Sequence, residues 1–136
     1  MEESLRSKHW ELTQKIIECA MNVHNSIGPG FREQVYQNAM GIEMSFYGLK
    51  HEEEIEFPIF HRSVQVGKRR ADSIVENLII LEYKARTEFG DQELAQGINY
   101  LEAAKFEIGL LINFGNKKLQ FKRLFNNKPG CTASLG

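Results

Sequence analysis

The chain contains few of the residues that would place it in a special structural class. Its 136 residues include two cysteines, three prolines and one tryptophan. Cys19 falls within a helical apolar pattern and Cys131 in a polar C-terminal stretch, and neither has metal-ligand spacing around it. We therefore expect a reducing compartment and no catalytic role for either thiol.

Long apolar runs are also missing. No stretch approaches the ~18 apolar residues that a membrane-spanning helix needs, and the N-terminus, Met-Glu-Glu-Ser, is acidic and polar. We expect a cytoplasmic protein with no membrane partner. The four histidines lack His-x-x-x-His spacing, which argues against a zinc site. The sequence also has no glycine loop followed by Lys-Ser or Lys-Thr, so it gives no sign of nucleotide hydrolysis.

Neither sign of charge is in excess. Seventeen basic and eighteen acidic residues give a formal charge of −1, so the chain as a whole has no excess of positive charge to drive binding to phosphate backbones. The distribution is uneven, however. Residues 33–56 hold six acids and one base, whereas residues 105–128 hold six bases and one acid. A basic face is therefore compatible with the neutral sum.

What the chain does contain is an ordinary globular composition, 42% apolar and 26% charged. This length predicts a single domain over residues 1–136, with its core at about 9–125. The stretch 126–136 lacks a core pattern, and we expect a mobile tail there.

Apolar periodicity and turn residues predict helix, helix, three strands, helix and two strands. Ser7 and Asp91 are the expected N-caps of the first and third helices, and Gly48 ends the second. The expected ranges are helices at 8–25 and 31–47, strands at 55–60, 63–75 and 78–84, a helix at 91–105, and strands at 107–114 and 117–125. A helix between the third and fourth strands requires a crossover. The fold class is therefore α/β, a mixed sheet with a three-stranded meander, a crossover helix and flanking N-terminal helices.

Charged residues at the end of a buried strand form the most informative pattern. The apolar run at residues 78–81 is typical of a strand covered on both faces. It ends in Glu82 and Lys84, which the two-residue period of a strand places on one face. Burying such charges costs several kcal/mol per ion unless they are paired or bind a metal.

The preceding strand supplies a second acid. If the turn at Glu76 and Asn77 centres the pairing near residue 77, Asp72 lies opposite Glu82. Cross-strand Cβ atoms are about 5 Å apart, a chelating distance for two carboxylates and a Mg²⁺ ion. The alternative is a structural ion pair of Glu82 and Lys84 with Asp72 at a solvated sheet edge. These residues alone leave both hypotheses open.

The order of elements, with an acid on the second strand and Glu-x-Lys on the third, resembles the restriction-endonuclease-like core of the PD-(D/E)xK nucleases. In this resemblance Asp72 corresponds to the first acid, Glu82 to the second and Lys84 to the lysine. Gln96 and Tyr100 on the next helix are similar to the glutamine and tyrosine motif of that superfamily's exonuclease branch.

Further motifs resemble the small GxxExxY family within that superfamily. They are Gly-Pro-Gly at 28–30, Gly-x-x-Glu-x-x-Tyr at 30–36, Arg-Ala-Asp at 70–72, Gln-x-x-Asn-Tyr-Leu at 96–101 and Ile-Asn-Phe-Gly at 112–115. Each motif is short, but all of them occur in this order. The resemblance covers about residues 9–125.

The resemblance implies a Mg²⁺- or Mn²⁺-dependent nuclease that hydrolyses phosphodiester bonds, with DNA expected before RNA as its partner. Asp72, Glu82 and Glu33 would hold the metal. Lys84 would orient the attacking water or stabilise developing charge, and Gln96 would hold a carboxylate or water at the site. A homodimer or a larger complex is compatible with the fold.

Three further side chains are candidate substrate contacts: Tyr36, Arg70 and Tyr100. Each candidate has a structural alternative. Glu33 is then an exposed carboxylate on a helix, Gln96 a packed amide, the two tyrosines core residues and the basic run 68–70 a solvated strand. The alternative function is a non-catalytic nucleic-acid-binding or protein-interaction module, or a subunit of a larger complex.

Overall fold

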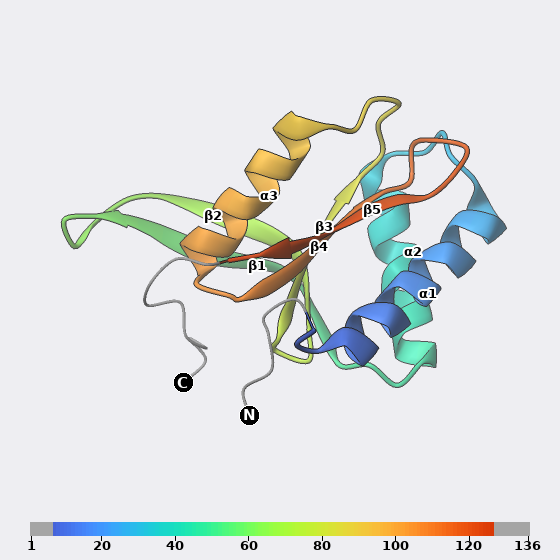
Figure 1. The fold of residues 1–136 in the computed structure, drawn as a ribbon, viewed down its shortest axis with the longest axis horizontal. Helices are drawn as coiled ribbons and strands as arrows, with labels where there is room; N and C mark the ends of the chain where they lie inside the picture. The colour runs from blue at the N-terminus through green and yellow to red at the C-terminus, as the bar shows by residue number, and fades with distance from the viewer. Residues whose placement is uncertain (1–6, 127–136) are drawn as a thin grey trace.

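The computed structural model describes residues 7–126, in which eight helices and strands follow the predicted order (Figure 1). The elements are α1 (Trp10–Ile27), α2 (Glu33–Phe46), β1 (His51–His61), β2 (Val64–Val75), β3 (Ile79–Lys84), α3 (Asp91–Ala104), β4 (Ile108–Asn113) and β5 (Gln120–Phe125). Within these described residues, no helix is long and apolar enough to cross a membrane.

The five strands form one mixed sheet in the order β1-β2-β3-β4-β5. The first three strands pair antiparallel, as does β5 with β4, whereas β3 and β4 are parallel because α3 crosses between them. Helices α1 and α2 cover one face of the sheet and α3 covers the other (Figure 1). The predicted α/β class, with its meander and crossover helix, is confirmed.

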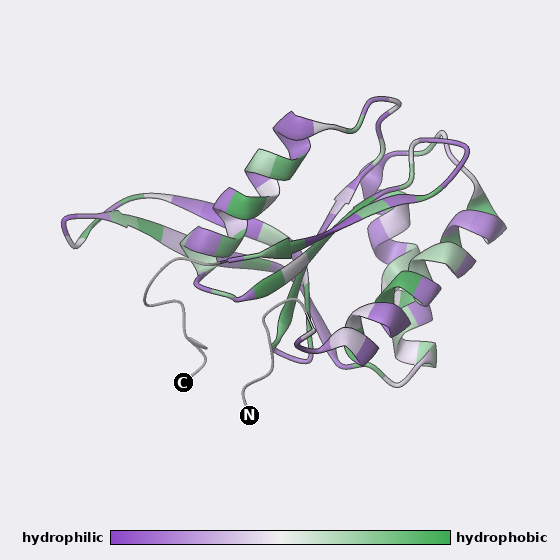
Figure 2. Cartoon of the chain, viewed as in Figure 1, coloured by the Kyte–Doolittle hydropathy of each residue, from purple (hydrophilic) through white to green (hydrophobic). Residues whose placement is uncertain are grey.

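Alternating side chains on the central strands divide the core into two layers. On β3, Leu81 packs beneath α1 and α2, whereas Ile80 packs beneath α3. Leu110 and Leu111 of β4 divide in the same way. The centre of the sheet is correspondingly apolar (Figure 2). Because both faces of β3 are covered, a charged group on this strand must find compensation within the protein.

Both predicted N-caps are wrong. Helix α1 begins after His9, which has a left-handed backbone with a φ of 57°, and Ser7 lies outside the helix. Gly90 caps α3 in place of Asp91, because the Glu93 carboxylate reaches back to accept the Gly90 N–H at 2.8 Å.

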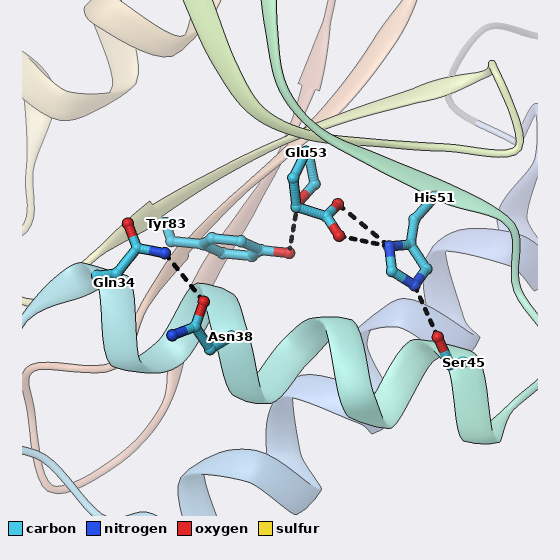
Figure 3. Close-up of polar contacts among 7 residues, drawn as sticks. Gln34, Asn38, Ser45, His51, Glu53 and Tyr83 are labelled. Carbon is cyan, nitrogen blue, oxygen red and sulfur yellow. Dashed lines mark hydrogen bonds and ion pairs between the residues drawn. The ribbon is translucent and has the colours of Figure 1, made fainter.

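Strand β1 begins at His51, earlier than the predicted start at residue 55. Its first residues are polar and give no apolar signal, but they have specific partners. His51 Nδ1 lies 2.7 Å from Glu53 Oε1, and His51 Nε2 lies 2.9 Å from the Ser45 hydroxyl on α2 (Figure 3). These polar contacts join α2 to the edge strand and explain why the strand extends beyond its apolar part.

The fold continues one residue beyond the predicted core. Asn126 is buried, and its amide donates to the carbonyls of Leu101 and Phe106 at 3.2 and 3.0 Å. These bonds satisfy carbonyl groups at the end of α3. Asn126 is therefore not part of a mobile tail, and residues 127–136 lie outside the described residues.

Tyr36 fixes the loop that precedes α2. Its ring is completely buried and stacks on Phe114, with centroids 4.6 Å apart and planes inclined by 5°. Its hydroxyl donates to the Gly28 carbonyl at 2.7 Å and accepts the Phe31 N–H at 3.2 Å. Gly28 itself has a φ of +78°, which favours glycine. The substrate contact predicted for Tyr36 is therefore wrong for this conformation, because the side chain holds the loop from inside the core.

Replacing Tyr36 by Phe should lower the free energy of unfolding by about 1–2 kcal/mol, because the stacked ring remains while the half-buried Gly28 carbonyl loses its donor. Urea denaturation measures the change. The control is Tyr47→Phe, whose hydroxyl contacts the exposed side chain of Asn22 and should matter less. Equal losses in the two variants would contradict the anchoring role.

Candidate functional site

The turn between β2 and β3 sets the register of the site. Glu76 and Asn77 occupy it with φ values of 54° and 57°, and the strand pairs are centred on residue 77, as predicted. The last pair of this ladder, Ser73 and Leu81, lies next to Asp72 on one strand and next to Glu82 on the other. The two carboxylates, called here the acidic pair, are therefore opposed across neighbouring strands.

Local backbone geometry holds Asp72 in place. Its Oδ2 accepts the backbone N–H of Tyr83 at 2.7 Å. The β1–β2 ladder is interrupted beside Asp72, where Glu54 has a φ of 56°. Left-handed backbone at a residue other than glycine is costly and often occurs at functional sites. Asp72 is thus bonded to β3 and not to β1.

Glu82 is the most perturbed acid of the structure. It is 4% exposed, and within the described residues its Oε1 is buried without a hydrogen-bond partner. Burial and the neighbouring Asp72 raise the pKa of Glu82 to about 9, while Lys84 and Arg69 act in the opposite direction. At neutral pH a proton thus takes the place of a second negative charge.

The same features fit a divalent cation. Two adjacent carboxylates with an oxygen lacking a partner are hard ligands of the kind that Mg²⁺ and Mn²⁺ prefer. A cation between them would remove the repulsion that the proton now removes, so the residues present fit a metal.

Lys84 follows Glu82 on β3 and is half-buried. Its charge lowers the pKa of Glu82, but none of the ion pairs found among residues 7–126 includes Lys84. The alternative of a structural ion pair with Glu82 is therefore not what the structure contains. The ammonium group remains available beside the acidic pair.

Helix α3 contributes Tyr100 to this region. The Arg69 guanidinium lies over the Tyr100 ring, 4.4 Å from its centroid. Burial and the charge of Glu82 raise the pKa of the Tyr100 hydroxyl, Arg69 lowers it, and Asp72 and Glu33 raise it further. The Tyr100 hydroxyl is thus close enough for the charges of the acidic pair to change its pKa. Arg69, which the sequence analysis considered only as part of the basic run at 68–70, contacts the Tyr100 ring.

Gln96 shares the helix face of Tyr100, as the spacing of four residues predicts, and is half-buried. Among the side-chain hydrogen bonds of the part of the chain that the structure describes, none involves Gln96. The bond to a carboxylate expected for it is therefore not formed in this conformation.

A groove of about 590 Å³ opens beside the acidic pair and joins it to α2. Its lining residues are Gly30, Phe31, Arg32, Glu33, Gln34, Gln37, Arg70, Asp72, Ala85 and Arg86. Glu33 and Asp72 thus share one groove, with Glu33 exposed. However, no three Asp, Glu, His or Cys side chains within residues 7–126 are grouped as a ready metal centre. Glu33 lies near the acidic pair without joining it in a three-acid cluster.

Three arginines line this groove with the acids. Arg70 pairs with Glu54 at 3.1 Å and Arg86 with Glu93 at 3.6 Å, and both guanidinium groups are more than half exposed. The Arg70–Glu54 pair is exposed on both sides and contributes little free energy, so a phosphate can replace Glu54, whereas Glu93 is buried and also accepts the Gly90 N–H. Arg70 thus lines the groove with an exposed guanidinium group, and its contact with a substrate stays a prediction.

Asn113 is a supporting residue that the site prediction omitted. It is completely buried, and its amide bonds both the N–H and the carbonyl of Arg86, each at 2.9 Å. A Cβ on the nearby Gly115 would overlap the Arg86 backbone. Both residues belong to the Ile-Asn-Phe-Gly motif at 112–115, in which a polar residue ends an apolar run. That pattern was the sequence signal that could have identified Asn113 as a residue that fixes this wall of the groove.

A mixed α/β sheet that carries opposed acids on its second and third strands, and a lysine beside them, is the arrangement expected of a nuclease-like core. A family model described as the PD-(D/E)XK nuclease superfamily matches residues 10–124. The chain belongs to the PD-(D/E)XK nuclease superfamily. The superfamily expected from the motifs is thereby confirmed, and the narrower GxxExxY family stays a prediction.

A solved structure described as "Crystal structure of SSO0001" is similar in fold, with a TM-score of 0.53 and 18% sequence identity. The match covers 89% of this chain and 61% of that one, so the present chain spans about three fifths of its length. At this identity the similarity concerns the fold alone. No curated protein matches the chain.

The acidic pair makes a prediction about pH. The pKa of Glu82 rises from 4.5 to about 9 on folding, so the folded state holds an extra proton between these values and the free energy of unfolding should fall as pH rises through this window. Glu82→Gln is neutral throughout. We expect it to be more stable than the parent at pH 8.5 by on the order of 2 kcal/mol, with a smaller difference at pH 5.

Urea denaturation of both proteins at pH 5, 7 and 8.5 measures this difference. Glu52→Gln, a change at an exposed acid on β1, serves as the control and should keep the parent's profile. An unchanged pH dependence in Glu82→Gln would show that Glu82 does not carry the extra proton.

Proposed function

We propose that this protein is a divalent-metal-dependent nuclease that hydrolyses phosphodiester bonds in DNA, and that it belongs to the GxxExxY family. One observation carries the proposal. In a chain of the nuclease superfamily, the acidic pair of Asp72 and Glu82 includes a buried carboxylate oxygen without a partner. An ionisable group buried in this way, with a strongly raised pKa, is a functional candidate.

Asp72 and Glu82 would hold Mg²⁺ or Mn²⁺, and Glu33 would reach it across the groove, directly or through water. When bound, such an ion neutralises charge on a phosphate and lowers the pKa of a water molecule. The side chains of the protein fix where this happens. Asp72 is held by the Tyr83 N–H, and Glu82 is confined beneath α3.

Lys84 would supply a positive charge on the same strand face as Glu82. From this position it would orient the attacking water or stabilise the negative charge that develops on the phosphate. Arg32, Arg70 and Arg86 line the groove and would bind the phosphates that flank the scissile bond. Gln96 would complete the site only after a change of rotamer toward the acids.

The proposal predicts Mn²⁺-dependent cleavage of DNA by the purified protein. Asp72→Asn, Glu82→Gln and Lys84→Ala should each slow it by at least about 100-fold, because each removes a ligand or the charge that acts on the phosphate. The assay follows labelled single- and double-stranded DNA on denaturing gels. Asp91→Asn, at an exposed acid on α3, is the matched control and should cut like the parent. Cleavage that survives all three changes would point to a contaminant or another site.

The alternative is a non-catalytic nucleic-acid-binding or interaction module with this fold. One observation favours it: among the described residues, no three potential ligands are grouped around a metal position. Calorimetric titration with Mn²⁺ distinguishes the two functions. Absence of binding at millimolar metal, with Asp72→Asn indistinguishable from the parent, would support the alternative.

The position of Glu33 predicts a graded effect on metal affinity. Because Glu33 is exposed and outside the acidic pair, Glu33→Gln should raise the Kd for Mn²⁺ roughly tenfold, as changes of supporting groups do. Asp72→Asn, which removes a direct ligand, should raise it much further. Calorimetry measures both, with Glu43→Gln on the same helix as the control. Equal effects of the Glu33 and Asp72 changes would show that Glu33 binds the metal directly.

A further inference from the structure

We propose that the β1–β2 hairpin is a duplex-DNA-binding ribbon that enters the major groove beside the cleavage site. This inference rests on the proposed function, because it names how the same site engages its substrate. The hairpin projects past the end of α3 (Figure 1). Phe57 at its base packs against Phe106, just after the end of α3, with ring centroids 6.0 Å apart, but residues 60–66 are all exposed.

The charge of the hairpin matches a polyanion. Between Phe57 and Ala71 the sequence has four arginine or lysine residues and no acid. Lys68 pairs with Glu56 at 3.4 Å and Arg70 with Glu54 at 3.1 Å. Both members of each pair are substantially exposed, so phosphates can compete for Lys68 and Arg70. None of the ion pairs found in the described part of the chain includes Arg62 at the tip.

The tip combines this charge with exposed apolar groups. Phe60, Val64 and Val66 are 59%, 64% and 63% exposed. On an edge strand such a patch invites association unless a partner covers it. A second copy of the chain is disfavoured as that partner, because the outer part of the hairpin, between Phe57 and Ala71, carries bases and no acid, so two such tips would repel one another. Base edges and thymine methyl groups inside a DNA groove offer apolar contacts together with attraction to the phosphates.

The turn itself is held in an unfavourable conformation. Arg62 and Ser63 have φ values of 48° and 65°, which is the two-residue hairpin turn that usually requires Asn-Gly. Neither residue is glycine, so the turn keeps a charged side chain at its apex at a conformational cost. Strain retained at an exposed tip is expected where the side chain has a task.

The shape selects duplex DNA. A two-stranded ribbon fits the major groove of B-DNA, whereas the major groove of an RNA duplex is too narrow to admit it. Single strands are bound by successive stacked aromatic rings, and between Arg62 and Asp72 the chain has none. Strand β2 begins at Val64 and leads to Asp72. At a rise of about 3.3 Å per residue these eight steps span roughly 26 Å, about three quarters of a turn of B-DNA. The tip would thus contact DNA somewhat less than one turn from the bond that is cut.

Fluorescence anisotropy with a labelled 25-base-pair duplex, in EDTA so that no hydrolysis occurs, tests the proposal with the full chain. Arg62→Asn removes the charge while asparagine tolerates the left-handed turn. It should weaken binding several-fold and reduce the slope of log K against log salt by about 0.9, the value for one phosphate contact. Phe60→Ser should weaken binding further, and an RNA duplex should bind at least tenfold less well than DNA. Lys15→Asn, at an exposed base on α1, is the control and should change neither quantity.

Parent-like affinity and salt slope in both hairpin variants, with circular dichroism spectra that show folded protein, would overturn the proposal. So would sedimentation in which Phe60→Ser converts a dimer to a monomer without changing DNA affinity, because the patch would then join two copies. The cleavage assay separates this from the proposed function. If neither the parent nor any variant cuts DNA but Arg62→Asn binds DNA more weakly than the parent, the DNA-binding ribbon is supported and the nuclease function is contradicted. If both hairpin variants cut DNA in the presence of metal and bind DNA as well as the parent does, the ribbon is contradicted and the nuclease function is supported.

Discussion

The opposition of Asp72 and Glu82 across β2 and β3 is the interaction on which the rest of the site depends. The Glu82 carboxylate could relax into water if β3 lay at an edge, but β3 is covered by helices on both faces. The Tyr83 N–H fixes Asp72, which lines the groove, and the packing of Ile80 beneath α3 keeps Glu82 buried. The repulsion is therefore relieved by a change of protonation or by a bound cation, and not by movement of Glu82 into water.

The alternation of side chains along β3 explains how one strand serves both stability and chemistry. Leu81 and Tyr83 face α1 and α2, where the Tyr83 hydroxyl donates to Ser73 at 3.2 Å. Glu82 and Lys84 face the opposite side, beneath α3. A one-residue slip in the pairing register of β3 would bury Lys84 among the aromatic residues and would disrupt both the core and the site. The packing of the core therefore also specifies the geometry of the site.

The parts that sequence reasoning found are the local ones. The turn at Glu76 and Asn77 fixes the register of β2 and β3, so the opposition of the two acids follows from positions ten residues apart. Features that depend on distant partners were not accessible. The polar start of β1 is fixed by Ser45 on α2, and Asn126 is fixed by carbonyls at the end of α3. The inward rotation of Tyr36 likewise depends on Phe114, a residue far along the chain. None of these contacts produces a periodic apolar pattern.

Net charge is a weak guide to how a surface would interact with phosphates, because electrostatic interactions in water are local. At physiological salt, charges separated by more than ~8 Å are largely screened. The acids of β1 lie beside the bases of β2, where Glu54 contacts Arg70, and they cancel in the sum without removing the guanidinium groups from the groove. A bound phosphate would meet the arginines that line the groove and Lys84, not the average charge of −1. A neutral chain can therefore present a surface suited to a polyanion, provided that its acids are either exposed partners of those bases or buried where a divalent cation can neutralise them.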